Sequence, residues 1–184
     1  EPRIGAIDKA CGEGLMPDSR RDLACLGVDL AAGHGAEFRG IFFAGEYDSA
    51  AAEFPRGVGI GVRRPVLHRL LLDRATELGV RFAWKTPVIL KPQRPAHIAG
   101  QPCAYRWLLG ADGHASRVRS WAGLETGLLR SRRFGFRAHY RVAPWSPWVE
   151  IHWGPLGQAY ITPVGPEEVC VAAICALAPL VTGK

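Results

Sequence analysis

The sequence predicts a mixed α/β (α+β) fold, in which a layer of helices and strands adjoins an antiparallel sheet. Helix and strand signals alternate through the first two thirds of the chain, whereas the last third carries strand and turn signals alone. No strand of that last third is followed by a crossover helix, so its strands are expected to be antiparallel. We expect the helix-and-strand layer at 1–37 and 59–126, and the sheet at 38–58 and 127–184.

Three helices are expected in the first layer. Leucines followed by a terminating glycine predict a short helix over 15–27. Pro65 suits a first helical turn, and five apolar side chains on one face followed by Gly79 predict a longer helix over 65–78. A short helix is expected at 116–122, with its first residue, a serine, as the N-cap.

Strands are predicted from short apolar runs bounded by turn residues. The predicted strands are 38–44, 50–54, 80–84, 88–90, 105–109, 134–142, 149–153, 158–164 and 169–174. In the seventh of these, Val149, Ile151 and Trp153 alternate with Glu150 and His152, which predicts a strand with one buried face. Residues between the fourth and fifth strands, rich in proline and glycine, are expected to form a surface turn over 91–101.

Composition narrows the possible partners. The net charge is +6, and 19 of the 23 basic residues are arginines scattered in pairs rather than gathered in a run. This distribution disfavours nucleic-acid binding, and binding of an anionic dinucleotide is the better functional role for the arginines. The apolar runs are too short to cross a bilayer, and the first residues lack the layout of a signal peptide. A cytoplasmic protein is therefore expected.

The five cysteines share no C-x-x-C spacing and do not cluster with histidines, which argues against a zinc site and against a disulfide framework. Cys25, Cys170 and Cys175 lie in apolar stretches and are expected to be small buried hydrophobic residues. Cys11 stands apart, because small residues beside a polar pair suit a loop that passes close to a flat ring system.

Four short motifs follow one another along the chain. They are Glu1-Pro2-Arg3, the DKACGEGLMP run at 8–17, Arg64-x-x-Leu67, and the GADG-x-x-S-x-VR run at 110–119. In this order and spacing they resemble FAD-dependent monooxygenases and geranylgeranyl-reductase-like flavoproteins of the p-hydroxybenzoate hydroxylase fold. The runs at 136–145 and 159–164 look like the substrate-side sheet of that fold. The resemblance implies part of an FAD-binding, Rossmann-like layer joined to a substrate-domain sheet.

The resemblance also implies a set of cofactor-binding residues. Glu1 matches a carboxylate that accepts hydrogen bonds from ribose hydroxyls, and Arg3 matches arginines near the cofactor. Arg64, at the head of the long helix, is expected to reach a phosphate or the ribityl side of the flavin, with a surface charge as the alternative. The backbone of Val88 is expected to contact adenine, while its side chain is expected to be core in either case.

Asp112 and Gly113 are implied near the pyrophosphate and the path of the reduced nicotinamide nucleotide. Glycine there permits a positive φ, and the aspartate is equally expected to cap the turn or the next helix without a ligand. Cys11 is implied at the substrate face of the flavin, where a purely structural cysteine is an equal alternative.

The family's Gly-x-Gly-x-x-Gly unit and its later Gly-Asp motif are not found in the sequence, so we expect a fragment of a longer flavoprotein. The expected function is an FAD-dependent oxidoreductase that uses NAD(P)H and acts on an apolar small molecule, without nucleic acid or stable membrane insertion. Hydroxylation and reduction of an isoprenoid-like double bond both remain open. The alternatives are a non-catalytic fragment that binds no flavin by itself and, more weakly, an unrelated basic α/β binding module.

Overall fold

The computed structural model describes residues 3–90, 96–125 and 133–176. The chain forms two compact units, one made of Glu1–Ile4 and Arg81–Arg130, the other of Gly5–Val80 and Ser131–Lys184. The second unit thus unites most of the predicted sheet with residues assigned from sequence to the other layer. The division of the chain into a cofactor domain and a substrate domain stays a prediction.

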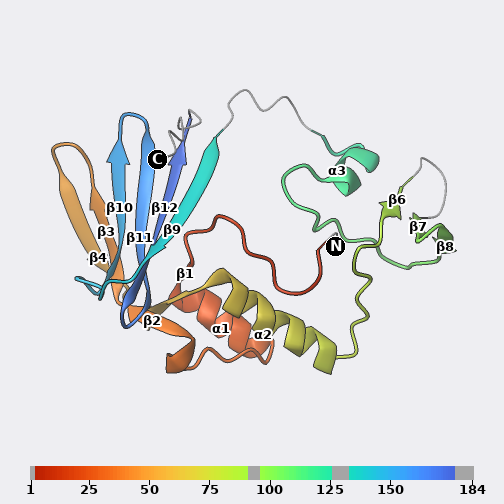
Figure 1. Ribbon diagram of the computed structural model, residues 1–184, viewed down its shortest axis with the longest axis horizontal. Coiled ribbons are helices and arrows are strands. Elements are labelled where there is room, and N and C mark those ends of the chain that lie inside the picture. The colour runs from red at the N-terminus through yellow and green to blue at the C-terminus, as the bar shows by residue number, and fades with distance from the viewer. Residues whose placement is uncertain (1–2, 91–95, 126–132, 177–184) are drawn as a thin grey trace. The chain divides into compact units, whose positions relative to one another are not determined.

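A six-stranded sheet dominates the second unit (Figure 1), in the order β4-β3-β10-β11-β12-β9. Its strands are β3 (Gly40–Ala44), β4 (Ser49–Glu53), β9 (Phe134–Tyr140), β10 (Trp148–Gly154), β11 (Gly157–Gly165) and β12 (Glu168–Cys175). Four of the five pairings are antiparallel, which confirms the antiparallel sheet predicted from the missing crossover helices. The exception is the parallel pairing of β10 with β3, which places Glu150 beside Phe42.

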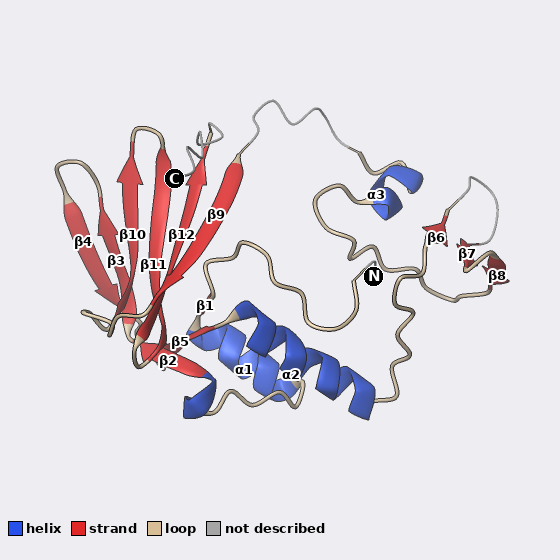
Figure 2. Ribbon diagram, in the orientation of Figure 1, coloured by secondary structure: helices blue, strands red, loops and turns tan. Residues whose placement is uncertain are grey.

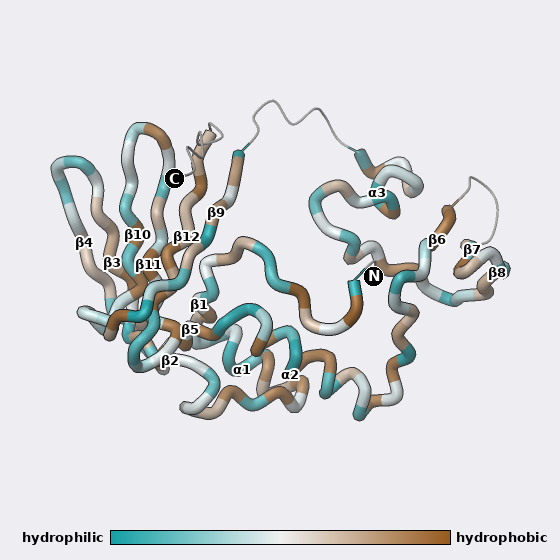
Figure 3. Tube along the Cα trace, in the orientation of Figure 1, coloured by the Kyte–Doolittle hydropathy of each residue, from teal (hydrophilic) through white to brown (hydrophobic). Residues whose placement is uncertain are grey.

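A smaller sheet and two helices pack together in the same unit (Figure 2). The sheet has the order β1-β5-β2. Its elements and helices are β1 (Gly14–Leu15), α1 (Pro17–Cys25), the 3-10 turn Ala32–His34, β2 (Gly35–Phe38), β5 (Gly59–Val62) and α2 (Arg64–Glu77). Leu30, Ile60 and Val62 form the buried centre, and apolar side chains of both helices pack on it. Both helices carry apolar and polar residues (Figure 3), and Leu23 of α1 and Val66, Leu67 and Leu70 of α2 are those that pack on this centre. Both predicted helices are confirmed.

The predicted one-sided burial of β10 is only partly right. Val149 is buried beside Gly14 and Phe38 of the smaller sheet, but Trp153 is 55% exposed. The smaller sheet covers one end of the strand and not the other, so burial follows position along the strand as well as its period. Glu150, predicted on the solvent side, is half-buried, and its carboxylate accepts hydrogen bonds from Trp145 and Ser146.

The first unit differs more from the prediction. It contains a three-stranded sheet of β6 (Val88–Ile89), β7 (Ala96–Ile98) and β8 (Gln101–Cys103), and the short helix α3 (Arg117–Trp121). The turn predicted over 91–101 therefore contains β7 and the first residue of β8, while 91–95 lie outside the described residues.

The strands predicted at 80–84 and 105–109 are not formed. No described strand pairs with either segment, and apolar composition without a ladder partner does not make a strand. Val88 is 44% exposed rather than core, because β6 lies at the edge of its small sheet. Among the described helices, none combines the length and the apolar character needed to cross a membrane.

Candidate functional site

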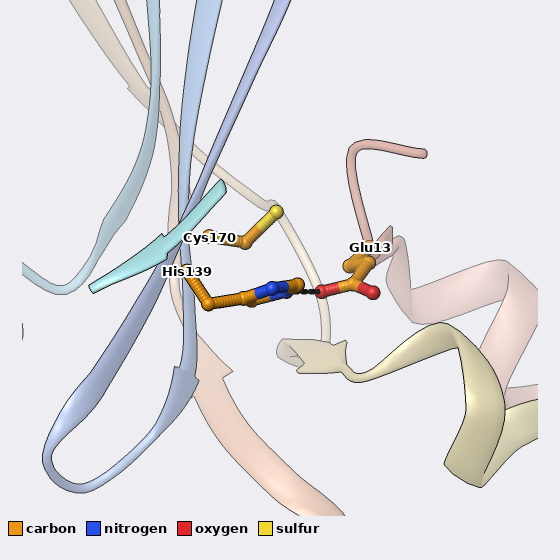
Figure 4. Close-up of side chains that lie close together, drawn as sticks. All are labelled: Glu13, His139 and Cys170. Carbon is orange, nitrogen blue, oxygen red and sulfur yellow. Dashed lines mark hydrogen bonds and ion pairs between the residues drawn. The ribbon is translucent and has the colours of Figure 1, made fainter. Parts of the chain in front are cut away.

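The loop before β1 places a buried carboxylate against the large sheet. The side chain of Glu13 is 0% exposed. Its Oε1 accepts hydrogen bonds from Nη1 of Arg137 at 2.8 Å and from the backbone N–H of Arg64 at 2.8 Å. Its Oε2 lies 2.6 Å from Nε2 of His139 (Figure 4). Residues from β9 and from the start of α2 therefore converge on one carboxylate.

Arg137 binds this loop at more than one position. Its Nη2 donates to Oδ1 of Asp8 at 2.5 Å, and its Nη1 also donates to the backbone carbonyl of Lys9 at 3.1 Å. The hydrogen bond from Arg137 lowers the pKa of Asp8 below its usual value. Burial lowers the pKa of Arg137, but the Asp8 hydrogen bond and the charge of Glu13 outweigh it, so the net shift is upward. The guanidinium therefore stays charged.

Cys170 of β12 completes a group with the donor types of a metal site. Ligand atoms of Glu13, His139 and Cys170 lie within 4.8 Å of one another. Two guanidiniums already neutralise the carboxylate, since Nε of Arg63 lies 3.9 Å from Glu13 and Arg137 lies closer. Burial, together with the charge of Glu13, raises the pKa of the Cys170 thiol to about 12. The arrangement favours an ion-pair network over a cation site.

An apolar pocket of about 200 Å³ opens beside this network. One wall is the loop segment Ala10, Cys11 and Gly12, and the other is the face of the large sheet. The sheet residues that line it are Gly135, Phe136, Tyr160, Ala172, Ala173 and Ile174. Cys11 therefore lies on a pocket wall, in a space suited to an apolar group. Its role at the face of a flavin stays a prediction.

Arg64 begins α2, as the sequence predicted. Its backbone N–H is bound by Glu13, but Nε of its guanidinium is buried without a hydrogen-bond partner among the described residues. A buried, unpartnered guanidinium donor next to a helix start fits an anionic or hydroxyl-bearing ligand, which is the requirement of an FAD phosphate or ribityl group. The residue present at this position is therefore compatible with the cofactor that the resemblance implies.

The Asp-Gly motif lies in the first unit, shortly before α3. Oδ2 of Asp112 accepts hydrogen bonds from the backbone N–H groups of Arg117 at 2.7 Å and Val118 at 3.3 Å. Its Oδ1 accepts one from the hydroxyl of Ser116, and this bond lowers the pKa of Asp112. Gly113 has the positive φ that was predicted, at 85°. Asp112 is thus a cap of the helix start, whatever ligand it meets.

Ser116 is the N-cap of α3, as predicted, because its Oγ accepts a hydrogen bond from the backbone N–H of Arg119 at 3.0 Å. Of the other predicted cofactor residues, Arg3 is exposed in the first unit and Val88 pairs with Ile98. Glu1 lies outside the described residues. Cys11 and Arg64 belong to the second unit, and the remaining predicted residues belong to the first.

Sequence reasoning missed three members of the buried network, namely Glu13, Arg137 and His139. One signal was present. Arg137 and His139 are two residues apart in a predicted strand and so share a face, and two such polar side chains side by side in a sheet call for a hydrogen-bonding partner. Glu13 stands between two glycines in the loop that the sequence had singled out.

The chain matches no protein-family profile. It is 30% identical over 147 residues to the dialkyldecalin synthase of Streptomyces rugosporus, a match covering 74% of this chain and 32% of that protein. Among solved structures it is similar to PqsL, a probable FAD-dependent monooxygenase from Pseudomonas aeruginosa, with a TM-score of 0.73 and 19% identity. It is also similar to a geranylgeranyl bacteriochlorophyll reductase-like protein from Thermoplasma acidophilum, with a TM-score of 0.73 and 21% identity.

These matches extend over most of this chain but only part of each relative. They cover 93% of this chain and 52% of PqsL, and 95% of this chain and 48% of the reductase-like protein. The chain thus spans about half of those structures and a third of the synthase. In agreement with the resemblance of its motifs to FAD-dependent monooxygenases and geranylgeranyl-reductase-like flavoproteins, the chain has the fold of about half of PqsL and of about half of the reductase-like protein.

Proposed function

We propose that this chain is part of an FAD-dependent oxidoreductase that takes electrons from NAD(P)H and acts on an apolar small molecule. The observation that carries the proposal is the apolar pocket of about 200 Å³ between the Cys11 loop and the large sheet. It occurs in a chain whose fold is shared with a probable FAD-dependent monooxygenase and a reductase-like protein. In this proposal, 1–37 and 59–126 belong to the cofactor domain, and 38–58 and 127–184 to the substrate domain.

The residues have distinct tasks in this proposal. When bound, the flavin supplies the electron transfer that side chains alone do not provide. Arg64 donates its unpartnered Nε–H to a phosphate or ribityl oxygen. The pocket walls exclude water and hold the substrate by apolar contact, with Tyr160 as one aromatic surface. Cys11 faces the substrate.

Two reactions compete within the proposal, and the relatives are compatible with both. PqsL is a probable monooxygenase, and the Thermoplasma acidophilum protein is reductase-like. The Streptomyces rugosporus protein is named as a synthase of a dialkyldecalin, which is an apolar carbocyclic compound. The apolar lining of the pocket supports an apolar substrate in each case.

Flavin binding is the first test. Protein expressed from the complete coding sequence is expected to be yellow, and Arg64→Ala is expected to weaken FAD binding. Loss of a charge-assisted hydrogen bond implies about 1–3 kcal/mol, or about 5- to 150-fold in Kd. Glu1→Ala is expected to have an effect of the same order. Arg20→Ala is the matched control, because Arg20 forms an ion pair with Glu37 and does not line the pocket.

The proposal would be contradicted if the protein from the complete coding sequence showed no flavin absorption band, either as purified or after addition of FAD. The alternative, a non-catalytic fragment, is tested on the 184-residue chain itself by titration with FAD and flavin fluorescence. Saturable binding at micromolar FAD would exclude that alternative, because it would show that this chain suffices to hold the cofactor.

Turnover under strict anaerobiosis separates the two reactions. A monooxygenase consumes oxygen in a substrate-dependent way, whereas a double-bond reductase needs only FAD and NAD(P)H. Cys11→Ala is expected to lower turnover more than it lowers FAD affinity, since Cys11 lies on the pocket wall. Unchanged turnover would assign Cys11 a structural role.

A further inference from the structure

One guanidinium holds the pocket-lining loop from both ends. Arg137 donates to Asp8 at 2.5 Å and to the carbonyl of Lys9 at 3.1 Å, on one side of Ala10, Cys11 and Gly12. It donates to Glu13 at 2.8 Å on the other side. The three residues between these contacts are the loop wall of the pocket. Arg137 therefore brackets the whole of that wall.

The same arginine lies on a strand that contributes residues to the opposite wall. Arg137 lies in β9 and pairs with Ala172 of β12, and Ala172 itself lines the pocket. Gly135, two residues earlier on the same face of β9, lines it as well. The Arg137 side chain is only 9% exposed. It joins the loop to the sheet.

The loop has a reason to move when this anchor is lost. Glu13 has a φ of 58°, in the left-handed region that glutamate rarely adopts. A backbone of this kind persists when its surroundings hold it in place. The carboxylate of Glu13 is held by Arg137, His139 and the start of α2, and of these three Arg137 also binds Asp8 and Lys9 at the other end of the loop.

We propose that Arg137 is a positioning residue that sets the shape of the pocket by fixing the wall of Ala10, Cys11 and Gly12 against the sheet. It acts through the loop and does not itself line the pocket. The identification of the pocket as the substrate site rests on the proposed function. The role of Arg137 in fixing the loop against the sheet does not depend on that function.

The test measures how freely iodoacetamide reaches Cys11 in protein expressed from the complete coding sequence. In Arg137→Lys the charge remains, but one ammonium group replaces the planar fork that reaches three acceptors. We expect alkylation of Cys11, measured by peptide mass spectrometry against the exposed Cys25 of the same molecule, to rise about tenfold through local opening of the loop. Arg20→Lys is the control, because Arg20 also bonds a carboxylate and a carbonyl but lies at no wall of the pocket.

Urea separates positioning from general destabilisation. If the loop opens locally, the Cys11 rate in Arg137→Lys is high already without urea and flat below the unfolding transition. A Cys11 rate that climbs with urea from the start would overturn the proposal, since it reports global opening. Asp8→Asn is a milder variant, because Asp8 is half-exposed, and a smaller rise in Cys11 alkylation is expected from it. If Arg137→Lys does not fold, the same comparison in Asp8→Asn tests the proposal.

An unchanged ratio of Cys11 to Cys25 alkylation in both folded variants would also overturn the proposal. FAD titration of the same samples keeps the two proposals apart. A wild-type protein that binds no FAD defeats the proposed function, while a raised Cys11 rate in the variants still supports the role of Arg137.

Discussion

Replacement of Glu13 by alanine is expected to destabilise the second unit strongly. The substitution removes the acceptor of Arg137, His139 and the Arg64 backbone N–H at once. A buried ion pair broken on one side costs about 3–5 kcal/mol, because the remaining charge stays buried without compensation. Asp8 still pairs with Arg137, so we place the loss near the lower end of that range.

The stability change follows from these contacts. About 3 kcal/mol for the ion pair, together with about 1 kcal/mol for the unpaired backbone N–H, gives about 4 kcal/mol. For a chain of this size this corresponds to a fall in Tm of roughly 8–16 °C. The loss is a large share of the roughly 5–15 kcal/mol that stabilises an ordinary domain.

Urea unfolding, read by hydrogen exchange of peptides from β11 and β12, measures the loss in the unit concerned. Lys85→Ala is a matched control, because Lys85 also has a left-handed backbone, with a φ of 52°, but is exposed. It is expected to change stability by less than about 0.5 kcal/mol. A loss below about 1 kcal/mol in Glu13→Ala would refute the reasoning, since the network would then contribute no more than a surface ion pair.

Three further outcomes follow from the structure. Gly61→Ala is expected to lower the free energy of unfolding by more than about 3 kcal/mol, measured in urea, because a Cβ there would overlap a backbone carbonyl of β11. Gly12→Ala is the control and is expected to be tolerated, because a Cβ at that position meets only open space. Ser116→Ala removes the N-cap of α3 and is expected to cost about 1 kcal/mol, seen as faster exchange of that helix alone. Arg137 lowers the pKa of Asp8, so the ionised carboxylate stabilises the folded protein above the unfolded pKa near 3.8, and this stabilisation is lost as pH falls through the lower folded pKa. Asp8→Asn is therefore expected to flatten the dependence of Tm on pH in that acidic range. An unchanged dependence would contradict this expectation.

Much of the fold could be predicted because its signals are local. The strands after residue 133 are joined by short turns, and proline and glycine mark the ends of α1 and α2. The segment 105–109 shows the limit of such reasoning. Its apolar residues predicted a buried strand, yet Trp107 and Leu109 are exposed, because a strand depends on a neighbour that local composition does not specify.

The site could be predicted only in part, for a related reason. The loop with Cys11 could be recognised from its own residues, and the structure places Cys11 on a pocket wall. Glu13 in the same loop depends on partners 124 and 126 positions away, at Arg137 and His139. No spacing rule connects residues so far apart, so the network could be found only once the sheet had brought β9 to the loop.

The parallel pairing of β3 with β10 has a consequence for the order of folding. Gly40 of β3 pairs with Trp148 of β10, so the hairpin of β3 and β4 is made early in synthesis but gains its second neighbour only after β10 has left the ribosome. Until then one edge of β3 offers unpaired backbone groups to other chains. Closing such a long loop makes this pairing a slow step. Translation pauses between β4 and β10, or loss of the C-terminal strands, would therefore be expected to increase aggregation during synthesis more than they change the finished protein.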